Sequence, residues 1–433
     1  MRLPVFVALF AVPVLACGTP MTPAPTPAAS PAAPAAAAAP APAQAPAVIT
    51  IHAGQLLDGK GGAISNATVV VQGSKILRVD RGAPAGGATY DLATMTVLPG
   101  IIDAHVHIAW YFNKDGRYVT TRGPSETAVQ SILYGAGNEY ATLMGGVTTI
   151  QSPGDFVDRD LRDWTAMGKI VGPRILTSLT PFQAARGARA APESLRAAIR
   201  ARKDSGADVI KIFASASIRT GGQLDIPAEQ INALCDEANK EGMRTMVHAH
   251  SAESIELVVN AGCKQIEHGI FATDADLKLM ADKGVYFDPQ VCLVLENYLQ
   301  NRDKFKSSIN DAGFDAMEKA IPVTTEMFKH AIKTPGLKVL FGTDAVAGAH
   351  GRNLEELICR VQRGGQAPMD AIISATSLNA EAMRLSDQIG SITPGLQADI
   401  IAVRGNPLTD ITTFRDVAFV MKGGTVYKWE GKR

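Results

Sequence analysis

The sequence predicts an α/β fold, a (β/α)8 TIM barrel with a small β-sandwich domain that both ends of the chain form. Three observations support this prediction. Short apolar strands alternate with helical segments between residues 99 and 384, which is typical of a parallel sheet covered by helices. Eight strand–helix units fit into this length, as a TIM barrel requires. Short strands separated by Gly and Asn turns flank the region on both sides.

The eight expected barrel strands are short runs of β-branched and apolar residues. They cover residues 97–105, 147–150, 174–177, 209–213, 245–248, 265–268, 285–288 and 339–344. The segments between them are expected to be helices. The helix expected over residues 227–240 begins at Pro227 and is followed by Gly242, a pattern typical of helix ends.

The flanking strands are expected to pair into the β-sandwich domain. Its first part covers residues 48–98 and its second part residues 385–433. The expected strands are residues 48–51, 67–72, 75–79, 398–403, 417–422 and 425–428.

Residues 1–16 resemble a signal peptide, with Arg2 ahead of an apolar run that is too short to span a membrane. The run ends at residues 14–17 in a lipobox-like segment, which predicts lipidation of Cys17. Cleavage by an ordinary signal peptidase and an uncleaved anchor are the alternatives. Residues 17–47 are rich in Ala and Pro and indicate an extended linker. The sequence thus predicts a periplasmic or cell-surface protein that meets the membrane only through an N-terminal lipid anchor.

Charge and cysteine content narrow the functional classes. Lys+Arg and Asp+Glu number 42 each. The chain therefore lacks the surplus of basic residues that would indicate nucleic-acid binding. Charge therefore says little about the partner; we expect a small-molecule substrate and no nucleic acid, and the sequence leaves a homo-oligomer open. Four cysteines follow Cys17, and their spacing fits neither a zinc knuckle nor a dense disulfide framework. They are either buried thiols or pairs formed after export: Cys235, Cys263, Cys292 and Cys359.

Five of the eight expected strands end in residues that can bind a metal. These residues are His105, His107, Lys211, His248, His268 and Asp344. The C-terminal ends of barrel strands converge on one face, so the side chains are expected to meet. Imidazole and carboxylate ligands together suit zinc and similar divalent ions. Any one of these residues alone would more often be structural than metal-binding. The prediction of a metal site rests on their occurring together at strand ends.

Lys211 is unusual because it lies inside the apolar run of residues 209–213. An unpaired ammonium group is costly to bury. We expect Lys211 to be deprotonated, paired or chemically modified. The alternative is a side chain whose stem crosses the core while its amine reaches solvent.

Several motifs resemble those of the amidohydrolase superfamily. Residues 98–107, LPGIIDAHVH, resemble its first-strand motif, residues 266–269, IEHG, its sixth, and residues 342–345, GTDA, its eighth. Residues 392–399, ITPGLQAD, are similar to the segment that returns to the small sheet domain in this superfamily. The resemblance extends over roughly residues 49–427.

The resemblance implies a hydrolase with two divalent metal ions, expected to be Zn²⁺. The implied ligands are His105, His107 and Asp344 for the more buried ion and His248 and His268 for the other, with a carboxylated Lys211 as the bridge. Water activated by the ions would lose a proton to Asp344, which would then protonate the leaving nitrogen.

Further residues are candidates for substrate binding. They are His250 beyond the fifth strand, His350 after the eighth strand, and Arg186, Arg219 and Arg352 on loops that follow strands. An Arg can bind a substrate carboxylate through two hydrogen bonds, although a single loop Arg is more often only solvated. His250 is expected either to face the substrate or to support a ligand. His52 and His330 lie outside the strand-end pattern and are expected to be structural.

Within the superfamily, the chain resembles imidazolonepropionase-like proteins and the metal-dependent dipeptidases called prolidases. Lys211 favours the dipeptidases, because imidazolonepropionases use one metal and lack this lysine. Residues 180–186 depart from many dipeptidase-like relatives in lacking a Gly-Gly-His element. The expected function is hydrolysis of an amide or peptide-type C–N bond in a dipeptide or N-acyl amino acid. The alternatives are hydrolysis of a lactam, lactone or ester in the same site, and a metal-binding surface lipoprotein without catalysis.

Overall fold

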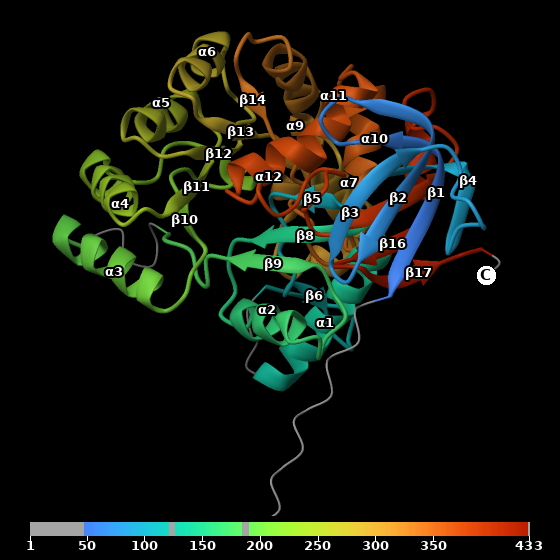
Figure 1. Cartoon of the computed structure of the whole chain (residues 1–433). Coiled ribbons are helices and arrows are strands. Elements are labelled where there is room, and N and C mark those ends of the chain that lie inside the picture. The colour runs from blue at the N-terminus through green and yellow to red at the C-terminus, as the bar shows by residue number, and fades with distance from the viewer. Residues whose placement is uncertain (1–46, 121–125, 184–189, 432–433) are drawn as a thin grey trace, which may run out of the picture. The chain divides into compact units, whose positions relative to one another are not determined.

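Eight short parallel strands lie at the centre of the computed structural model, which describes residues 47–120, 126–183 and 190–431 (Figure 1). They are β5 (Ile101–Asp103), β8 (Val147–Ser152), β9 (Arg174–Thr177), β10 (Val209–Phe213), β11 (Arg244–Ala249), β12 (Gln265–His268), β13 (Tyr286–Asp288) and β14 (Lys338–Val339). Hydrogen bonds divide them into a sheet of order β5-β8-β9 and a sheet of order β10-β11-β12-β13-β14.

Two isolated parallel bridges connect these two sheets. Val106, just after β5, pairs with Ala345, which follows β14, and Phe182, which follows β9, pairs with Ile212 of β10. A single continuous sheet of eight strands is not recorded among the described residues. One bridge thus links the β5 edge to the β14 edge, and the other links the β9 edge to the β10 edge.

The first and last of these strands are shorter than the sequence predicts. Residues 97–99 belong instead to β4 (Tyr90–Pro99), where Val97 pairs with Leu56 and Ala402 of another sheet. The eighth strand ends at Val339, and Asp344 lies on the segment that follows it. Residues 97–99 pair with strands of the other sheet, and beyond Leu340 the N–H of Phe341 donates to the side chain of Asn379 instead of to a neighbouring strand.

Helices cover the outside of the parallel strands (Figure 1). They are α1 (Ala128–Met144), α2 (Asp158–Ala166), α3 (Pro192–Asp204), α4 (Ala228–Lys240), α5 (Ala252–Asn260), α6 (Asp274–Asp282), α7 (Leu293–Gln300), α8 (Arg302–Phe305), α9 (Asp311–Ala331), α10 (Leu354–Gln362), α11 (Pro368–Ile373) and α12 (Asn379–Ala382). The helix expected over residues 227–240 is confirmed as α4, with Pro227 immediately before it. None of the helices in the described part of the chain is both long and apolar enough to cross a membrane.

Strands from both ends of the described chain pair into one further sheet. Its order is β17-β16-β15-β4-β1-β2-β3. Apart from β4, its members are β1 (Val48–Leu57), β2 (Ala63–Gln72), β3 (Lys75–Arg81), β15 (Ile400–Arg404), β16 (Val417–Lys422) and β17 (Thr425–Trp429). The pairing of the two ends agrees with the prediction. The expected sandwich of two sheets is not confirmed, because these strands form a single sheet.

The four cysteines after Cys17 form two disulfide bonds. Cys235 of α4 pairs with Cys263, and Cys292 pairs with Cys359 of α10. All four side chains are buried. Of the two possibilities that the sequence leaves open, the structure therefore shows paired cysteines.

Candidate active site

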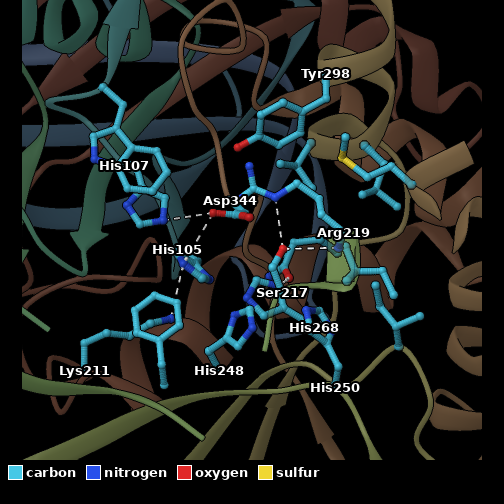
Figure 2. Close-up of a pocket in the computed structure, with 18 residues that line it drawn as sticks. His105, His107, Lys211, Ser217, Arg219, His248, His250, His268, Tyr298 and Asp344 are labelled. Carbon is cyan, nitrogen blue, oxygen red and sulfur yellow. Dashed lines mark hydrogen bonds and ion pairs between the residues drawn. The ribbon is translucent and has the colours of Figure 1, made fainter. Parts of the chain in front are cut away.

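All six expected metal ligands line one pocket with a volume of about 140 Å³ (Figure 2). The parallel strands explain the convergence, because each ligand lies in or just after the C-terminal end of its strand. Lys211 is within β10, His248 is within β11, and His268 ends β12. His105 and His107 follow β5 rather than lying within it.

His105, His107 and Asp344 form the most compact group of donor atoms. The Nε2 atom of His107 lies 3.1 Å from Oδ1 of Asp344, and the Nε2 atom of His105 lies 3.5 Å from the same oxygen. One ligand atom from each residue lies within 4.8 Å of the other two. This donor set of two nitrogens and one oxygen fits a divalent ion such as zinc.

His248 and His268 lie beside this group, with ring centroids 4.5 Å apart. The ring of His268 is also 5.2 Å from that of His105. Nδ1 of His268 donates to Oε1 of Gln290 at 2.6 Å, which leaves Nε2 available as a ligand atom. Gln290 therefore fixes the orientation of this imidazole.

The backbone is strained at two of the six residues. The φ angles of His268 and Asp344 are 69° and 50°, in the left-handed region that residues other than glycine rarely adopt. Such strain is often found where a side chain is held in position for function. Here it directs a histidine and a carboxylate into the same pocket.

Lys211 is almost completely buried, with 1% of its surface exposed. Its Nζ lies 3.5 Å from Nε2 of His105, and no carboxylate within the described ranges forms an ion pair with it. Burial lowers the pKa of Lys211, although the negative charges of Glu267 and Asp344 act in the opposite direction. A buried amine with a lowered pKa is more readily present in its neutral, nucleophilic form.

Burial also lowers the pKa of each of the four histidines expected to be ligands. They are therefore neutral at physiological pH, which is the form that binds metals. Burial alone would raise the pKa of Asp344, but His105, His107 and Lys211 outweigh it, so that the pKa is lowered. Neutral imidazoles around an ionised carboxylate suit a cation, and the donor set fits a divalent metal.

A buried carboxylate orients His105 from the other side of its ring. Oε2 of Glu267 lies 2.7 Å from Nδ1 of His105, and Glu267 is fully buried. Asp288 lies behind it, and burial raises the pKa of both carboxyl groups, to about 7 for Glu267. A carboxylate behind a ligating histidine fixes the ring and its tautomer. Gly342 is required here, because a Cβ atom at this position would lie 2.1 Å from Oδ2 of Asp288.

The opposite wall of the pocket contains one cationic side chain among apolar ones. Arg219 lies in the short 3₁₀ helix η2 (Ile218–Thr220), and its Nε donates to Oγ of Ser217 at 3.0 Å. Within the described residues, no carboxylate forms an ion pair with Arg219. The neighbouring apolar lining consists of Ile218, Ile270, Val294, Leu295 and Met317.

Tyr298 is the polar group of this wall that the sequence analysis missed. It is buried on α7, and Figure 2 shows it with Arg219 on the side of Asp344 away from His107. Burial raises the pKa of Tyr298 to about 12, so its hydroxyl remains a hydrogen-bond donor at neutral pH. No sequence pattern marks it, because it lies on a helix rather than at a strand end.

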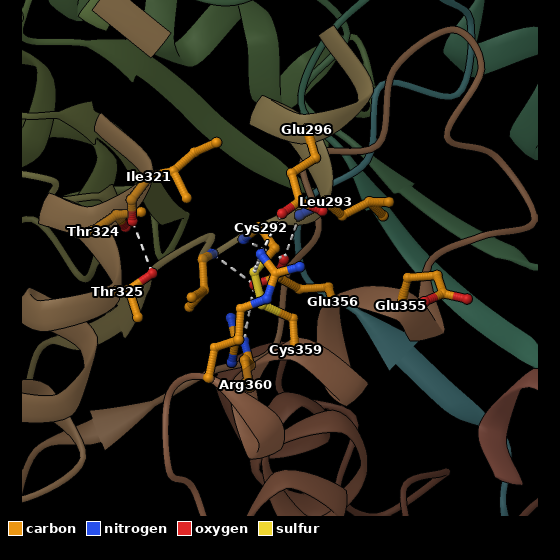
Figure 3. The surroundings of a disulfide bond; sticks show 12 residues. Cys292, Leu293, Glu296, Ile321, Thr324, Thr325, Glu355, Glu356, Cys359 and Arg360 are labelled. Atoms are coloured by element: carbon orange, nitrogen blue, oxygen red, sulfur yellow. Dashed lines mark hydrogen bonds and ion pairs between the residues drawn. A yellow bond between two sulfur atoms is a disulfide. The ribbon is translucent and has the colours of Figure 1, made fainter. Parts of the chain in front are cut away.

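The segment that leads into α7 is fixed by contacts with α10 (Figure 3). The carboxylate of Glu356 accepts hydrogen bonds from the backbone N–H groups of Val291, Cys292 and Leu293 at 2.6, 3.0 and 2.9 Å. The Cys292–Cys359 disulfide joins the same segment to α10. The start of α7, and hence the wall that contains Tyr298, is therefore held by two independent constraints.

The other residues expected to bind substrate do not all lie in the pocket. His250 lines the pocket, whereas His350 and Arg352 do not. Nε2 of His350 donates to the carbonyl oxygen of Trp110 at 3.1 Å, and Arg352 donates to Gln300 at 3.2 Å. Neither side chain lines the pocket, and their expected contact with substrate stays a prediction.

His52 and His330 lie away from the pocket and form hydrogen bonds with aspartates, as expected of structural residues. Arg186 and Cys17 lie outside the described residues. Trp110 is a further residue of the site that was not predicted from the sequence, and its ring stacks on His107 with centroids 3.5 Å apart. Trp110 lies three residues after His107, and Gln290 lies shortly after β13. Both positions follow strand ends, so both residues could have been predicted to line the site.

Comparisons with known proteins agree with this geometry. Residues 96–427 match the model of the Amidohydrolase family. Ochratoxinase from Aspergillus niger is 27% identical over 436 residues, covering 89% of this chain and 87% of that protein. Imidazolonepropionase from a Ruegeria strain is 23% identical over 389 residues, covering 79% of this chain and 88% of that protein.

A solved structure of a related protein resembles this chain in its fold. The crystal structure of a Xaa-Pro dipeptidase with bound methionine superposes with a TM-score of 0.78 at 30% identity, covering 88% of this chain and all of that one. A family match over most of the chain, together with these relatives, establishes the class of protein. The chain belongs to the amidohydrolase family and is a hydrolase that acts on carbon–nitrogen bonds.

Proposed function

We propose that this enzyme hydrolyses the amide bond of a small substrate with a free carboxylate, such as a dipeptide or an N-acyl amino acid. One observation carries the proposal: Arg219 points into the pocket of the expected metal ligands and has no carboxylate partner there. A partly buried guanidinium group without an anion is a good site for a substrate carboxylate. The Xaa-Pro dipeptidase, a structural neighbour, acts on substrates of this class by its name.

The proposed cofactor is a pair of divalent ions, expected to be Zn²⁺. His105, His107 and Asp344 would hold one ion, His248 and His268 would hold the other, and a carboxylated Lys211 would bridge them. When bound, such ions polarise a carbonyl group and lower the pKa of water. The buried position and lowered pKa of Lys211 support its carboxylation, since a carbamate forms on a neutral amine.

The chain's own residues supply the remaining chemistry. Asp344 is ionised and faces the pocket, where it would accept a proton from the attacking water and then protonate the leaving nitrogen. Arg219 would bind the substrate carboxylate. The apolar lining from α7 and α9 would exclude bulk water from the scissile bond and contact an apolar side chain of the substrate.

A paired-substrate assay tests this proposal. The purified enzyme, supplied with zinc, is assayed with dipeptides and N-acyl amino acids and with the same compounds whose carboxylate is converted to a neutral amide. We expect hydrolysis of the acids, with kcat/KM at least tenfold above that of the neutral forms. Equal or faster hydrolysis of the neutral forms would contradict the role of the carboxylate. Activity only on lactams, lactones or esters would favour the alternative chemistry.

We also propose that the eight parallel strands close into a (β/α)8 barrel and that the protein is exported. The two bridges between the parallel sheets support the first proposal. The two buried disulfides support the second, because such bonds persist in oxidising compartments. Mass spectrometry of the mature N-terminus would test for a lipid on Cys17, and an intact segment 1–16 would contradict export by this route.

A further inference from the structure

Exposed apolar side chains are concentrated on α1 and on α2 with the residues that follow it. Seven of the eleven large apolar side chains that are exposed in the described ranges lie within residues 129–171, and six of these belong to α1, to α2 or to the residues that follow α2. We call them the α1–α2 face: Val129, Leu133 and Tyr140 from α1, and Trp164, Met167 and Val171 from α2 and its C-terminal extension. Their exposed fractions range from 41% to 66%.

The two helices pack against each other, so these side chains lie on adjacent helices. Oε2 of Glu139 on α1 accepts a hydrogen bond from Thr165 of α2 at 2.5 Å, and Gly135 lies against Leu161. Figure 1 shows α1 and α2 side by side below β8 and β9. The exposed apolar area of the face is on the order of 600 Å², close to the roughly 800 Å² that each partner buries in a stable interface.

The outer surface of α1 carries no charge. Glu139 is its one residue of the types Asp, Glu, Lys, Arg and His, and it is buried against α2. Such a surface can meet a copy of itself without bringing like charges together, and the centres of protein interfaces are depleted of charged residues. The α1 part of the face can therefore pack against a copy of itself without burying a charge.

Gly137 gives this surface a notch between Leu133 and Tyr140. A Cβ atom at Gly137 would meet nothing within 4 Å, so the fold of a single chain does not require glycine there. Glycine inside a helix costs about 1 kcal/mol relative to alanine. The notch can receive a large side chain from a second chain, as Leu133 would do across a two-fold axis.

We propose that two copies of this chain associate through the α1–α2 face, each placing Leu133 near the Gly137 notch of the other. A lipid surface is a poorer occupant, because helices that lie on membranes carry Lys and Arg beside their apolar face. Here α2 carries three aspartates and two arginines, and α1 carries no base. The linker of residues 19–47 is also a poor occupant, since Met21 is its one large apolar side chain.

Sedimentation velocity of the purified protein at micromolar concentration tests the proposal. A single chain has a mass of 45.6 kDa, and we expect the wild-type protein to sediment as a dimer or as a larger assembly of dimers. Gly137→Arg fills the notch, and its Cβ atom would meet no described atom within 4 Å, whereas Leu133→Asp places a charge on the face. We expect both variants to lose the α1–α2 contact and to sediment as smaller species, with an unchanged circular dichroism spectrum.

Val323→Asp provides the matched control, because Val323 is similarly exposed on α9, away from this face. We expect it to sediment as the wild-type protein does. A monomeric wild-type protein would overturn the proposal, and so would variants that keep the full assembly. A wild-type monomer that floats with phosphatidylcholine vesicles would assign the face to lipid and overturn it as well. None of these outcomes depends on the substrate.

Discussion

Nε2 of His107 lies 3.1 Å from Oδ1 of Asp344, although the two residues follow the first and the last of the eight parallel strands. The contact therefore brings together, inside the pocket, the segments that follow β5 and β14. A backbone φ of 50° at Asp344 directs its carboxylate there. The contact therefore locates the position where a cation and the proton-accepting group would act together.

Replacing Asp344 tests its role in proton transfer. Asp344→Asn keeps the shape of the side chain but removes the proton acceptor, so kcat should fall by roughly 10²–10⁴-fold. Circular dichroism and the content of the ion held by His248 and His268 should be preserved. Turnover within a few-fold of the wild-type rate, with both ions bound, would exclude Asp344 from proton transfer.

Replacing Arg219 tests carboxylate recognition. A hydrogen bond to a charged group contributes about 1.5–3 kcal/mol, which corresponds to roughly 10- to 150-fold in affinity. Arg219→Met should therefore raise KM for an acidic substrate by about this factor, with a smaller effect on its neutral amide. Arg352→Met is the control, because Arg352 lies outside the pocket. Equal effects of the two substitutions would argue against Arg219 as the recognition residue.

The two disulfides should affect the enzyme differently. Cys292–Cys359 fixes the start of α7, which carries Tyr298, whereas Cys235–Cys263 lies away from the pocket. Replacing either pair by alanine should cost about 2–4 kcal/mol of the free energy of unfolding. Only the loss of Cys292–Cys359 should also raise KM at temperatures where both variants are folded. An unchanged KM in that variant would show that Glu356 alone holds the segment.

The pH dependence of stability should reflect Glu139. Burial raises its pKa from 4.5 to about 8, against the opposing effects of its hydrogen bond with Thr165 and of the charge on Lys422. The folded chain thus retains a proton that the unfolded chain loses near pH 4.5. The stabilisation is complete below that pH and is lost as the pH rises to about 8, by at most roughly 1.4 kcal/mol per pH unit.

Glu139→Gln removes this titration. Denaturant unfolding at pH 5 and pH 8 should show a smaller loss of stability for Glu139→Gln than for the wild-type protein. The buried Asp158 has a pKa raised in the same way and is present in both proteins, so the difference isolates Glu139. Parallel pH profiles for the two proteins would contradict this assignment.

Much of the fold, and the convergence of the six side chains on one pocket, could be predicted from the sequence, because residues at strand ends have a recognisable pattern. The apolar run around Lys211 and the His-X-His at residues 105–107 mark positions where a strand enters the site. Strand order then explains how they meet. The boundary between the flanking strands and the parallel strands was less predictable. Because β4 continues almost directly into β5, the sequence pattern indicates one strand where the structure has two.

The pocket wall that contains Arg219 and Tyr298 was the least predictable part of the site. Arg219 could be named as a candidate but not distinguished from Arg352, because both are loop residues and only tertiary packing decides which one faces the pocket. Tyr298 lies on a helix whose position depends on Glu356 and Cys359, both distant in sequence. Long-range contacts of this kind leave no local pattern.

The most direct test of the central claim is the metal content of the purified enzyme measured together with its activity. Elemental analysis should find two divalent ions per chain, and chelation should abolish hydrolysis, which added zinc should restore. Lys211→Ala should bind fewer ions and lose most of its activity, whereas Lys203→Ala, on the exposed side of α3, should match the wild-type protein. Undiminished hydrolysis by metal-free enzyme, or by Lys211→Ala with unchanged metal content, would contradict the account.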